Sequence, residues 1–536
     1  MPSDSRASWR PLVAIALTMT MVYITSFGIN VLIGAIVADL ETTVANLQLV
    51  IVLASVVGGS LMVTAGRLAD KLGKKKVLLA GIVLYMAGLT TVVLSPNATV
   101  FTIAWSLIWP AGMVLILPTT ISMIMFYYEG GQRAAAFGAY GAVLSAVSAI
   151  APVLIGFLTT EFNWRIALAL SPAVGVVALM VSLSLEETER DSSIQIDLPS
   201  VLLSLAGFGL FLVTTTMAGQ FGWFAEKRPF MIGEMQLSLM GLSVVPLFYA
   251  LSAGLLIAFV QRGRALSRKG LDPLLDVSIL KNTPFTIGMT LTALFFLVNA
   301  GIIFVVSVFL QAGAKFDSLD TALTTLPYTA CVAVLSFFTP NLGKRVPPKW
   351  IIVAGLLLMI TGTHVIGLEA GVDIAPSDLL VGMLLLGAGA GLVMAQASTV
   401  TMWTVPAEDS GAASGLSETL KEIMGQGFAV ALAGSILFGA VYGNMTERYE
   451  TIEGLELSEP ERASLIIELE DTFQTISEAK EREFVATLPE KSRQEYDAIV
   501  ADSATKAFST ALAAMNGFAV VAALLALAIP GRRIED

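Results

Sequence analysis

Two long apolar runs of this chain are joined by the short basic stretch Gly66-Arg67-Leu68-Ala69-Asp70-Lys71-Leu72-Gly73-Lys74-Lys75-Lys76. The first run ends near Ala65 and the second begins near Val77. Positively charged loops between membrane spans remain on the cytoplasmic side of the membrane. The glycines at both ends and the single carboxylate of Asp70 indicate a tight, charge-paired connection. The stretch therefore predicts two membrane-spanning helices and the side to which their connection faces.

The composition is typical of a polytopic membrane protein. Of 536 residues, 55% are hydrophobic and 14% are charged, whereas a soluble globular protein carries about 25% charged residues. The single cysteine, Cys331, excludes a disulfide within the chain, and the single histidine, His364, excludes a histidine-built metal or catalytic cluster. The sequence contains no phosphate-binding loop and no nucleic-acid-binding signature. We therefore predict an all-α membrane protein that is not an enzyme, needs no metal or cofactor and has the lipid bilayer as its surroundings.

Fourteen segments are apolar over the ~20 residues that a membrane-spanning helix needs. They are residues 11–37, 44–66, 76–95, 98–127, 134–158, 164–184, 198–218, 237–261, 284–311, 319–340, 350–368, 378–402, 411–442 and 506–530. An even number places both termini on one side. With that side cytoplasmic, most Lys and Arg residues lie in inner loops and tails, and the short outer loops hold only Arg165, Lys227, Arg228 and Lys315. The charge bias therefore predicts a multi-pass protein of the plasma (inner) membrane with both termini in the cytoplasm.

Residues 443–505, between the last two predicted spans, carry most of the net charge of −11. Ser458-Glu459-Pro460-Glu461 and Thr487-Leu488-Pro489-Glu490 are typical capping boxes with a proline in the first helical turn. We therefore predict a helical hairpin outside the membrane, on the outer face. It is either a solvated insertion that a surface loop tolerates, or a lid or a docking element for a protein partner over the outer mouth.

The stretch from Gly66 to Lys76 resembles the loop motif G-x-L-a-D-[RK]-x-G-[RK]-[RK] of the major facilitator superfamily, at the same place between spans two and three. With fourteen predicted spans, the chain resembles the branch of drug:proton antiporters, whose members have two additional linker helices. The resemblance implies two six-helix bundles around a central cavity that opens alternately to each side. The expected segments are the N-terminal bundle at 1–190, the two linker helices at 191–283, the first five helices of the C-terminal bundle at 284–442, the acidic hairpin at 443–505, and the last helix with a cytoplasmic tail at 506–536.

The same resemblance implies that the basic loop forms a conformational latch on the cytoplasmic side. Asp70 and the neighbouring bases would make charge contacts between helices, and a carboxylate near a helix N-terminus contributes on the order of 1 kcal/mol. A contact of that size biases a two-state equilibrium without locking it. The alternative is a loop that only sets topology. The residues assigned to the latch are Gly66, Arg67, Asp70, Gly73, Lys74, Lys75 and Arg133.

The chain departs from the family at the positions that usually handle protons. Where drug-exporting members carry an aspartate in span one, this chain has Thr25, and where they carry an arginine in span four, it has Ser106. The span-five motif G-P-x-x-G-G is reduced to Pro152 and Gly156. Protons are therefore either not coupled to transport or handled elsewhere in the chain.

Span thirteen offers such a place, since it contains Glu418, Lys421 and Glu422. Spacings of three and four residues put the three side chains on one helix face. A charge inside a span costs at least ~2.5 kcal/mol, so these charges are expected to face a cavity or one another. Two carboxylates would compete for one ammonium, and one of them could bind a proton at ordinary pH. The alternative is an ion pair that only stabilises the helix.

Other polar or aromatic side chains inside the predicted spans are candidates for the lining of a cavity. Asn30, Gln311 and Gln396 either line it or form hydrogen bonds between helices. Trp109, together with nearby methionine side chains, would suit a lipophilic substrate. The alternative for Trp109 is ordinary packing in the core.

These observations predict a secondary transporter that exports amphipathic or lipophilic small molecules by alternating access, driven by proton influx through Glu418 or Glu422. The missing aspartate and arginine keep open a carrier or flippase for an endogenous lipid or metabolite, without the family's usual proton coupling. From another class, a non-transporting membrane scaffold or sensor would use the acidic hairpin as its interaction surface.

Overall fold

A computed structural model describes residues 8–188, 190, 196–226, 230–232, 235–237, 241–271, 273–274, 280–343, 345–371, 373–402, 405, 410–450 and 490–529. Within these ranges the chain is almost entirely helical, and fourteen helical segments are long and apolar enough to cross a membrane. The predicted all-α fold with fourteen spans is therefore confirmed.

The N-terminal half of the bundle contains six spans. They are α1 (Arg10–Gly28) with the 3₁₀ turn η1 (Ile29–Val31), α3 (Val44–Leu72), α4 (Lys74–Val93), α5 (Ala98–Ile103) with the π-helical turn η2 (Ala104–Ile108) and α6 (Trp109–Tyr127), α7 (Gly130–Glu161), and α8 (Trp164–Leu183). A short helix, α2 (Ile33–Asp39), follows η1. Two linker spans come next, α9 (Leu198–Phe221) and α10 (Val245–Arg268), with a small antiparallel hairpin of β1 (Phe230–Ile232) and β2 (Met235–Leu237) between them.

The C-terminal half contains the other six spans, and two of them have a π-helical turn. They are α11 (Thr283–Val308) with η4 (Phe309–Gly313), α12 (Ser318–Gly343), α13 (Pro348–Leu368), α14 (Leu380–Met402), α15 (Ser410–Lys421) with η6 (Glu422–Phe428) and α16 (Ala429–Glu450), and α19 (Glu490–Ala526).

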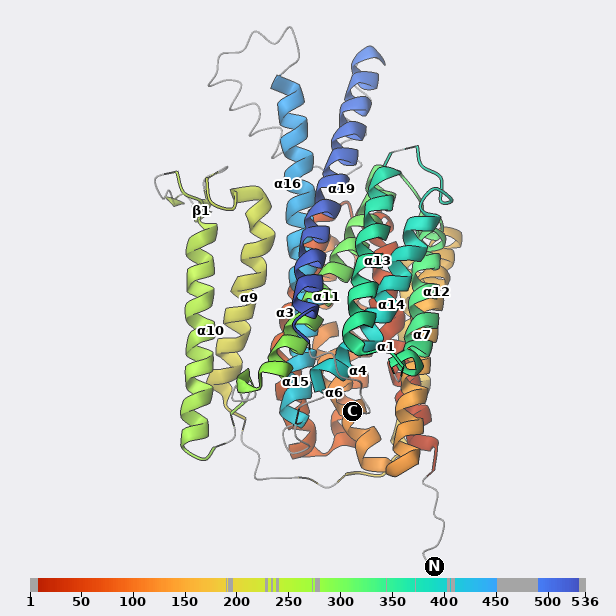
Figure 1. The fold of residues 1–536 in the computed structure, drawn as a ribbon, viewed down its shortest axis with the longest axis vertical. Coiled ribbons are helices and arrows are strands. Elements are labelled where there is room, and N and C mark those ends of the chain that lie inside the picture. Colours follow the sequence, from red (N-terminus) through yellow and green to blue (C-terminus); the bar gives the residue numbers. More distant parts are fainter. Residues whose placement is uncertain are drawn as a thin grey trace, which may run out of the picture.

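The two halves meet along two seams. In one seam α7 packs against α12, and in the other α3 packs against α15, η6 and α16. The linker helix α9 contacts both α3 and α16, so it covers the second seam, and α10 packs on α9 at the edge of the bundle (Figure 1). Small residues permit this approach, since a Cβ added at Gly219 of α9 would lie 2.9 Å from the carbonyl oxygen of Ser435.

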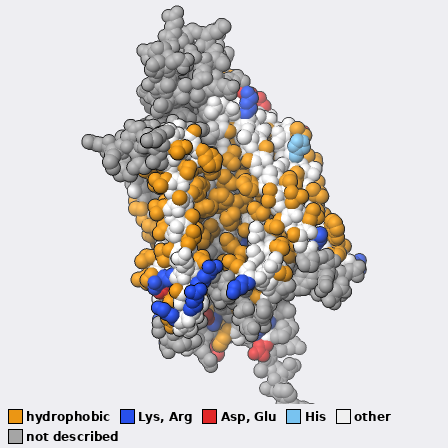
Figure 2. Space-filling view, turned by 60° about the vertical axis from the view of Figure 1, so that its left-hand side comes forward, with side chains coloured by type: hydrophobic (Ala, Val, Ile, Leu, Met, Phe, Trp, Pro, Cys, Tyr) orange, Lys and Arg blue, Asp and Glu red, His pale blue; other side chains and the backbone are white. Residues whose placement is uncertain are grey.

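The surface divides into a hydrophobic middle and two polar ends. Figure 2 shows a broad hydrophobic face with Lys and Arg side chains gathered near its lower end. We call the end that carries Arg10 and the loop between α3 and α4 the basic end. The end at which α16 finishes and α19 begins is called the insertion end (Figure 1).

Polar side chains at helix starts fix where several spans begin. Thr43, Asn97, Asn163 and Asn282 each accept a hydrogen bond from the backbone N–H three residues later, at 2.9 to 3.2 Å. Such caps satisfy N–H groups that have no partner inside the helix and stabilise the start of a helix by ~1 kcal/mol. The spans therefore begin at residues that the sequence marks plainly.

The last two spans extend further than their apolar sequence predicts. Helix α16 runs to Glu450, eight residues beyond the predicted end at 442, and α19 begins at Glu490 rather than at 506. Apolar content marks where a helix can lie in lipid, and it does not mark where the helix ends. Glu490, the last residue of the second predicted capping box, is the first residue of α19. The rest of that box and the first box, at 458–461, lie outside the described residues.

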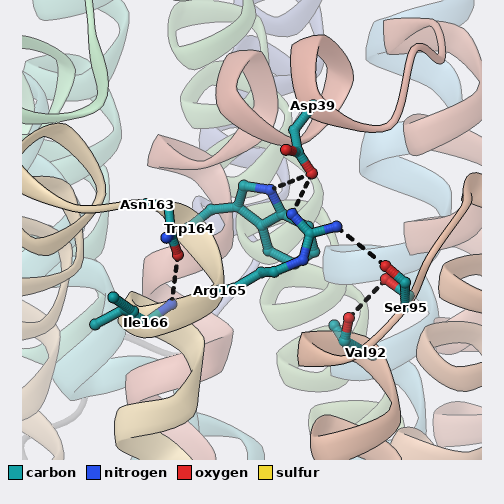
Figure 3. Close-up of polar contacts among 7 residues, drawn as sticks. All are labelled: Asp39, Val92, Ser95, Asn163, Trp164, Arg165 and Ile166. Carbon is teal, nitrogen blue, oxygen red and sulfur yellow. Dashed lines mark hydrogen bonds and ion pairs between the residues drawn. The ribbon is translucent and has the colours of Figure 1, made fainter.

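A polar brace holds three elements of the N-terminal half together at the insertion end (Figure 3). Asp39 at the end of α2 pairs with Arg165, and it also accepts a hydrogen bond from the Trp164 indole at 3.1 Å. Arg165 donates to the carbonyl oxygen of Ser95 after α4 at 3.0 Å, and its guanidinium carbon lies 4.4 Å from the centroid of the Trp164 ring. Arg165 therefore has a structural role within one half.

Candidate functional site

The charged residues of span thirteen lie together, as their spacing predicts. Lys421 Nζ lies 2.7 Å from Glu418 Oε1, and 18% of the Lys421 side chain is exposed compared with 41% of the Glu418 side chain. Lys421 Nζ also lies 5.8 Å from the centroid of the Phe296 ring in α11. The ammonium group is therefore held by Glu418 and by an aromatic face within its own half.

The side chain of Glu422, in the C-terminal half, lies against the N-terminal half. Glu422 is the first residue of the π-helical turn η6, and a Cβ added at Gly58 of α3 would lie 3.1 Å from Glu422 Oε1. At the next position, a Cβ on Gly59 would lie 2.3 Å from Cγ1 of Ile423. Two consecutive glycines therefore let α3 approach η6 closely. Among the described residues, no hydrogen bond or ion pair of the Glu422 carboxylate is found.

Two tyrosines of the N-terminal half complete the surroundings of these carboxylates. Tyr23 of α1 interacts electrostatically with Glu418 and Glu422, and Tyr140 of α7 interacts with Tyr23 and with Glu418. Tyr23 also stacks on Phe27, with ring centroids 5.5 Å apart. Carboxylates from one half thus face phenol groups from the other, near the middle of the spans. Such a site can hold a proton and an amphipathic molecule, because it combines acidic oxygens with aromatic faces.

At the insertion end the side-chain amide of Gln311 joins the two halves. Gln311 of η4 donates to the carbonyl oxygens of Asn30 at 2.6 Å and of Ser307 at 3.1 Å, and it accepts from the N–H of Gly34 at 2.8 Å. Asn30 and Gly34 flank the break between η1 and α2, where the regular helical hydrogen bonds are interrupted. Gln311 therefore satisfies backbone groups of the opposite half, and Asn30 participates through its backbone.

A second amide joins the halves along the other seam. Gln48 of α3 is 2% exposed and donates to the carbonyl oxygens of Val430 at 3.0 Å and Ala431 at 3.1 Å, both in α16. A Cβ at Gly434 would lie 2.3 Å from the Gln48 nitrogen, so a glycine makes room for the amide. Sequence reasoning missed Gln48, although an amide inside an apolar run was the signal that could have identified it.

The remaining span-five motif lies on the α7–α12 seam at the insertion end. Pro152 is buried inside α7, and Gly156 follows one turn later. A Cβ on Gly156 would lie 2.6 Å from the carbonyl oxygen of Ser318, and Thr160 Oγ1 accepts the N–H of Leu319 at 3.2 Å. The seam is therefore closed by backbone contact at this end.

The predicted latch residues surround the loop between α3 and α4. Asp70 pairs with Lys74 at 3.0 Å, and Gly73 adopts φ 100° against the carboxylate of Glu187. The Lys75 side chain donates to the carbonyl oxygen of Leu185 at 2.5 Å. These contacts join the loop to the segment after α8, within the N-terminal half.

Three other latch residues have different partners. Arg67 donates to the carbonyl oxygen of Pro273 in the connection before α11, so it joins the loop to the linker region. Arg133 donates to the carbonyl oxygens of Tyr128 at 2.7 Å and Met125 at 2.9 Å, and it thereby caps the end of α6. Gly66 lies beside Pro118 of α6.

Two of the predicted cavity residues lie inside one half rather than between the halves. Trp109 is 6% exposed and packs against Trp105, with ring centroids 4.9 Å apart. Gln396 is 1% exposed and donates to the carbonyl oxygen of Thr339 at 3.3 Å, which joins α14 to α12. Both contacts correspond to the alternatives of helix packing and hydrogen bonding between helices.

Neutral side chains occupy the two positions where the family's proton-handling residues usually stand. Thr25 is buried beside Tyr85, and Ser106 of η2 donates to the carbonyl oxygen of Val50 at 3.3 Å. The interior of the N-terminal half is therefore polar without being charged at these positions.

Comparisons with known proteins agree with this architecture. The chain is 25% identical to the multidrug resistance protein Stp of Mycobacterium tuberculosis (strain CDC 1551 / Oshkosh) over 435 residues, which are 81% of this chain and 76% of that protein. It is 25% identical to the quinolone resistance protein NorB of Staphylococcus aureus (strain MSSA476) over 76% of this chain and 83% of NorB. It is 24% identical to a probable actinorhodin transporter of Streptomyces coelicolor (strain ATCC BAA-471 / A3(2) / M145) over 78% of this chain and 70% of that protein.

The fold is also found among solved structures. A bacterial homolog of the human lysosomal transporter Spinster, in an inward-facing and occupied conformation, matches with a TM-score of 0.62 at 15% identity, over 97% of this chain and 96% of that one. The model of the Major Facilitator Superfamily matches residues 15–430. This chain therefore belongs to the major facilitator superfamily of membrane transporters.

Proposed function

We propose that this protein exports amphipathic or lipophilic small molecules by alternating access, in exchange for protons. The substrate would lie between the halves near the middle of the spans, among Tyr23, Tyr140 and Phe296. Aromatic faces next to carboxylates suit a molecule with an apolar body and a cationic group. The drug-resistance relatives support an export role.

The position of Glu422 carries this proposal. Its carboxylate lies at the contact between the two halves, beside Gly58, while the neighbouring ammonium of Lys421 is engaged by Glu418 at 2.7 Å. A carboxylate at this contact would be reached by water from whichever side of the membrane the two halves open to. Loading a proton from one side and releasing it on the other requires such a place. We assign Glu422 as the proton carrier and Glu418 as the residue that holds Lys421 away from it.

The proposed orientation has the basic end in the cytoplasm, and therefore both termini as well. The Lys and Arg residues near Arg67 and on α10 favour this side by the positive-inside rule. Gln48 and Gln311 would then close the outer side. A pH gradient of one unit stores ~1.4 kcal/mol per proton, enough for about tenfold accumulation with one proton per substrate.

A reconstituted assay tests the proposal. Purified protein in proteoliposomes is supplied with ethidium, and its transport is followed with and without an imposed pH gradient. We expect gradient-dependent transport by the native chain and by Glu369→Gln, which neutralises an exposed carboxylate at the insertion end. We expect Glu422→Gln to lose the gradient-dependent part. Equal gradient-driven rates in Glu422→Gln and the native chain would contradict the role of this residue.

A second candidate is a carrier for an endogenous lipid or metabolite that does not use protons. Thr25 and Ser106 favour it, because they leave the N-terminal half without charge at the usual coupling positions. The same assay separates the candidates. A carrier of this kind would exchange substrate at the same rate with and without the gradient, in the native chain and in Glu422→Gln.

A further inference from the structure

A cavity of about 550 Å³ lies at the basic end, away from the contact between the halves. Helix α3 contributes its last turns, α4 its first turns, α6 one wall, and the segment after α8 one side chain. The residues that line it are Leu68, Lys71, Leu72, Lys76, Val77, Ala80, Leu115 and Arg190. It is separate from the proposed transport site, which lies near Glu422.

The wall of this cavity is apolar and the rim is basic. Val77 is 3% exposed, whereas Leu72 is 45% exposed and Ala80 is also exposed. Ala80 lies one helical turn deeper into span three than Lys76. The cations therefore lie where the helices leave the hydrophobic region, and the apolar wall continues into it.

Two acidic residues at this end, Asp70 and Glu187, are engaged by other residues. Asp70 pairs with Lys74 at 3.0 Å, and Glu187 accepts the backbone N–H groups of Lys75 and Thr188, each at 3.1 Å. Across the described part of the chain, no ion pair is found for Lys71, Lys76 or Arg190. Three cations of the rim thus share one cavity, and none of them has an acidic partner among the residues that the structure describes.

We propose that this cavity binds one anionic phospholipid of the cytoplasmic leaflet. Lys71, Lys76 and Arg190 would hold the phosphate, and the start of an acyl chain would lie along Val77, Ala80 and Leu115. Basic pockets between membrane helices on the cytoplasmic side suit anionic headgroups. The apolar wall favours a lipid over a free phosphate ion, because only a lipid covers it.

Bound lipid would also act on the loop between α3 and α4. Lys71 lies in the last turn of α3 and Lys76 in the first turn of α4, so one headgroup would hold both ends of the loop. This consequence does not depend on which substrate is transported.

Native mass spectrometry of the purified full chain tests the proposal. Phosphatidylglycerol, phosphatidylcholine and inorganic phosphate are added separately, and the retained adducts are counted. We expect phosphatidylglycerol to be retained at least about fivefold more than phosphatidylcholine, with no stable phosphate adduct. Retention of phosphate equal to that of phosphatidylglycerol would overturn the lipid assignment, and equal retention of the two lipids would overturn the site.

Three variants locate the binding. The triple variant Lys71→Gln, Lys76→Gln, Arg190→Gln should lose the preference for phosphatidylglycerol. The matched triple variant Arg264→Gln, Arg268→Gln, Lys269→Gln removes the same charge at the same end of the bundle, outside the cavity, and should keep it. Ala80→Trp keeps the charges and fills the apolar wall, and it should also lose the preference. Equal losses in both triple variants would show only a general attraction to a basic surface, and would contradict the proposal.

Discussion

The interface between the two halves differs between its middle and its insertion end. In the middle, charged side chains of span thirteen face Gly58 and Tyr23 across the contact. At the insertion end, the halves are joined by neutral amides and by backbone contact at Gly156. Neutral contacts can close and open without taking up or releasing protons. The difference indicates that closure and proton coupling are carried by different residues and can be altered separately.

The largest effect on closure is expected from Gly156→Leu. A Cβ at this position would lie 2.6 Å from a backbone carbonyl oxygen that cannot move aside as a side chain can. Overpacking costs ~1–3 kcal/mol and occasionally more, so the insertion end should remain open and transport should fall by more than about tenfold. Spin labels attached at Glu161→Cys and Glu369→Cys, in a Cys331→Ser background, lie on opposite halves. The distance between the two labels should be longer in Gly156→Leu than in the native sequence at this position.

The matched control for this change is Gly138→Leu in the same helix. Nothing lies within 4 Å of a Cβ added at Gly138. Gly138→Leu should therefore keep the native label distance and rate. An unchanged label distance in Gly156→Leu would contradict the assignment of this contact to closure.

A smaller shift is expected from Gln311→Leu. The change removes the partners of the Asn30 carbonyl and the Gly34 N–H. These two groups are only partly buried, so the cost lies at the low end of the ~1–3 kcal/mol of a buried group without a partner, which corresponds to about a fivefold shift of the equilibrium towards the open state. Gln396→Leu is the control, because its amide joins two helices of the same half. If both variants shift the label distance equally, the amide at Gln311 has no special role in closure.

The smallest effect concerns the linker helices, which lie outside both regions. Hydrogen bonds from Arg262 at 2.6 and 2.7 Å hold the pKa of Asp197 well below its ordinary value. A carboxyl group whose pKa is lowered on folding stabilises the folded state above its unfolded pKa of ~3.9, and this contribution is lost as the pH falls towards the folded pKa.

Thermal unfolding in detergent measures this contribution. The free energy of unfolding of the native chain should exceed that of Asp197→Asn by about 1 kcal/mol or less. The difference in Tm should stay constant from about pH 7 to pH 5 and shrink below about pH 4. If the Tm difference between the native chain and Asp197→Asn grew on acidification, the lowered pKa assigned to Asp197 would be contradicted.

The sequence predicted the spans and the pairing of Glu418 with Lys421, because apolar length and helical spacing are local properties. It did not predict the turns η2, η4 and η6, since a π-helical turn depends on packing rather than on a residue signature. Sequence spacing also cannot bring Gln311 to Asn30 across 281 positions.

Two features of the sequence mark the seam between the halves. The pair Gly58-Gly59 in a span indicates a close approach of another helix, and Gln48 interrupts an apolar run. All three residues lie on the seam where α3 packs against η6 and α16. Trp109, in contrast, was a candidate on residue type alone, and its surroundings are those of a packed core residue.

Proton release on substrate binding tests most directly whether Glu422 is the coupling group. Ethidium is added to purified protein in weakly buffered detergent solution that contains a pH indicator. The native chain and Gln311→Leu should release protons, and Glu422→Gln should release none while still binding the dye by fluorescence. Undiminished proton release from Glu422→Gln would contradict the separation of closure from coupling proposed here.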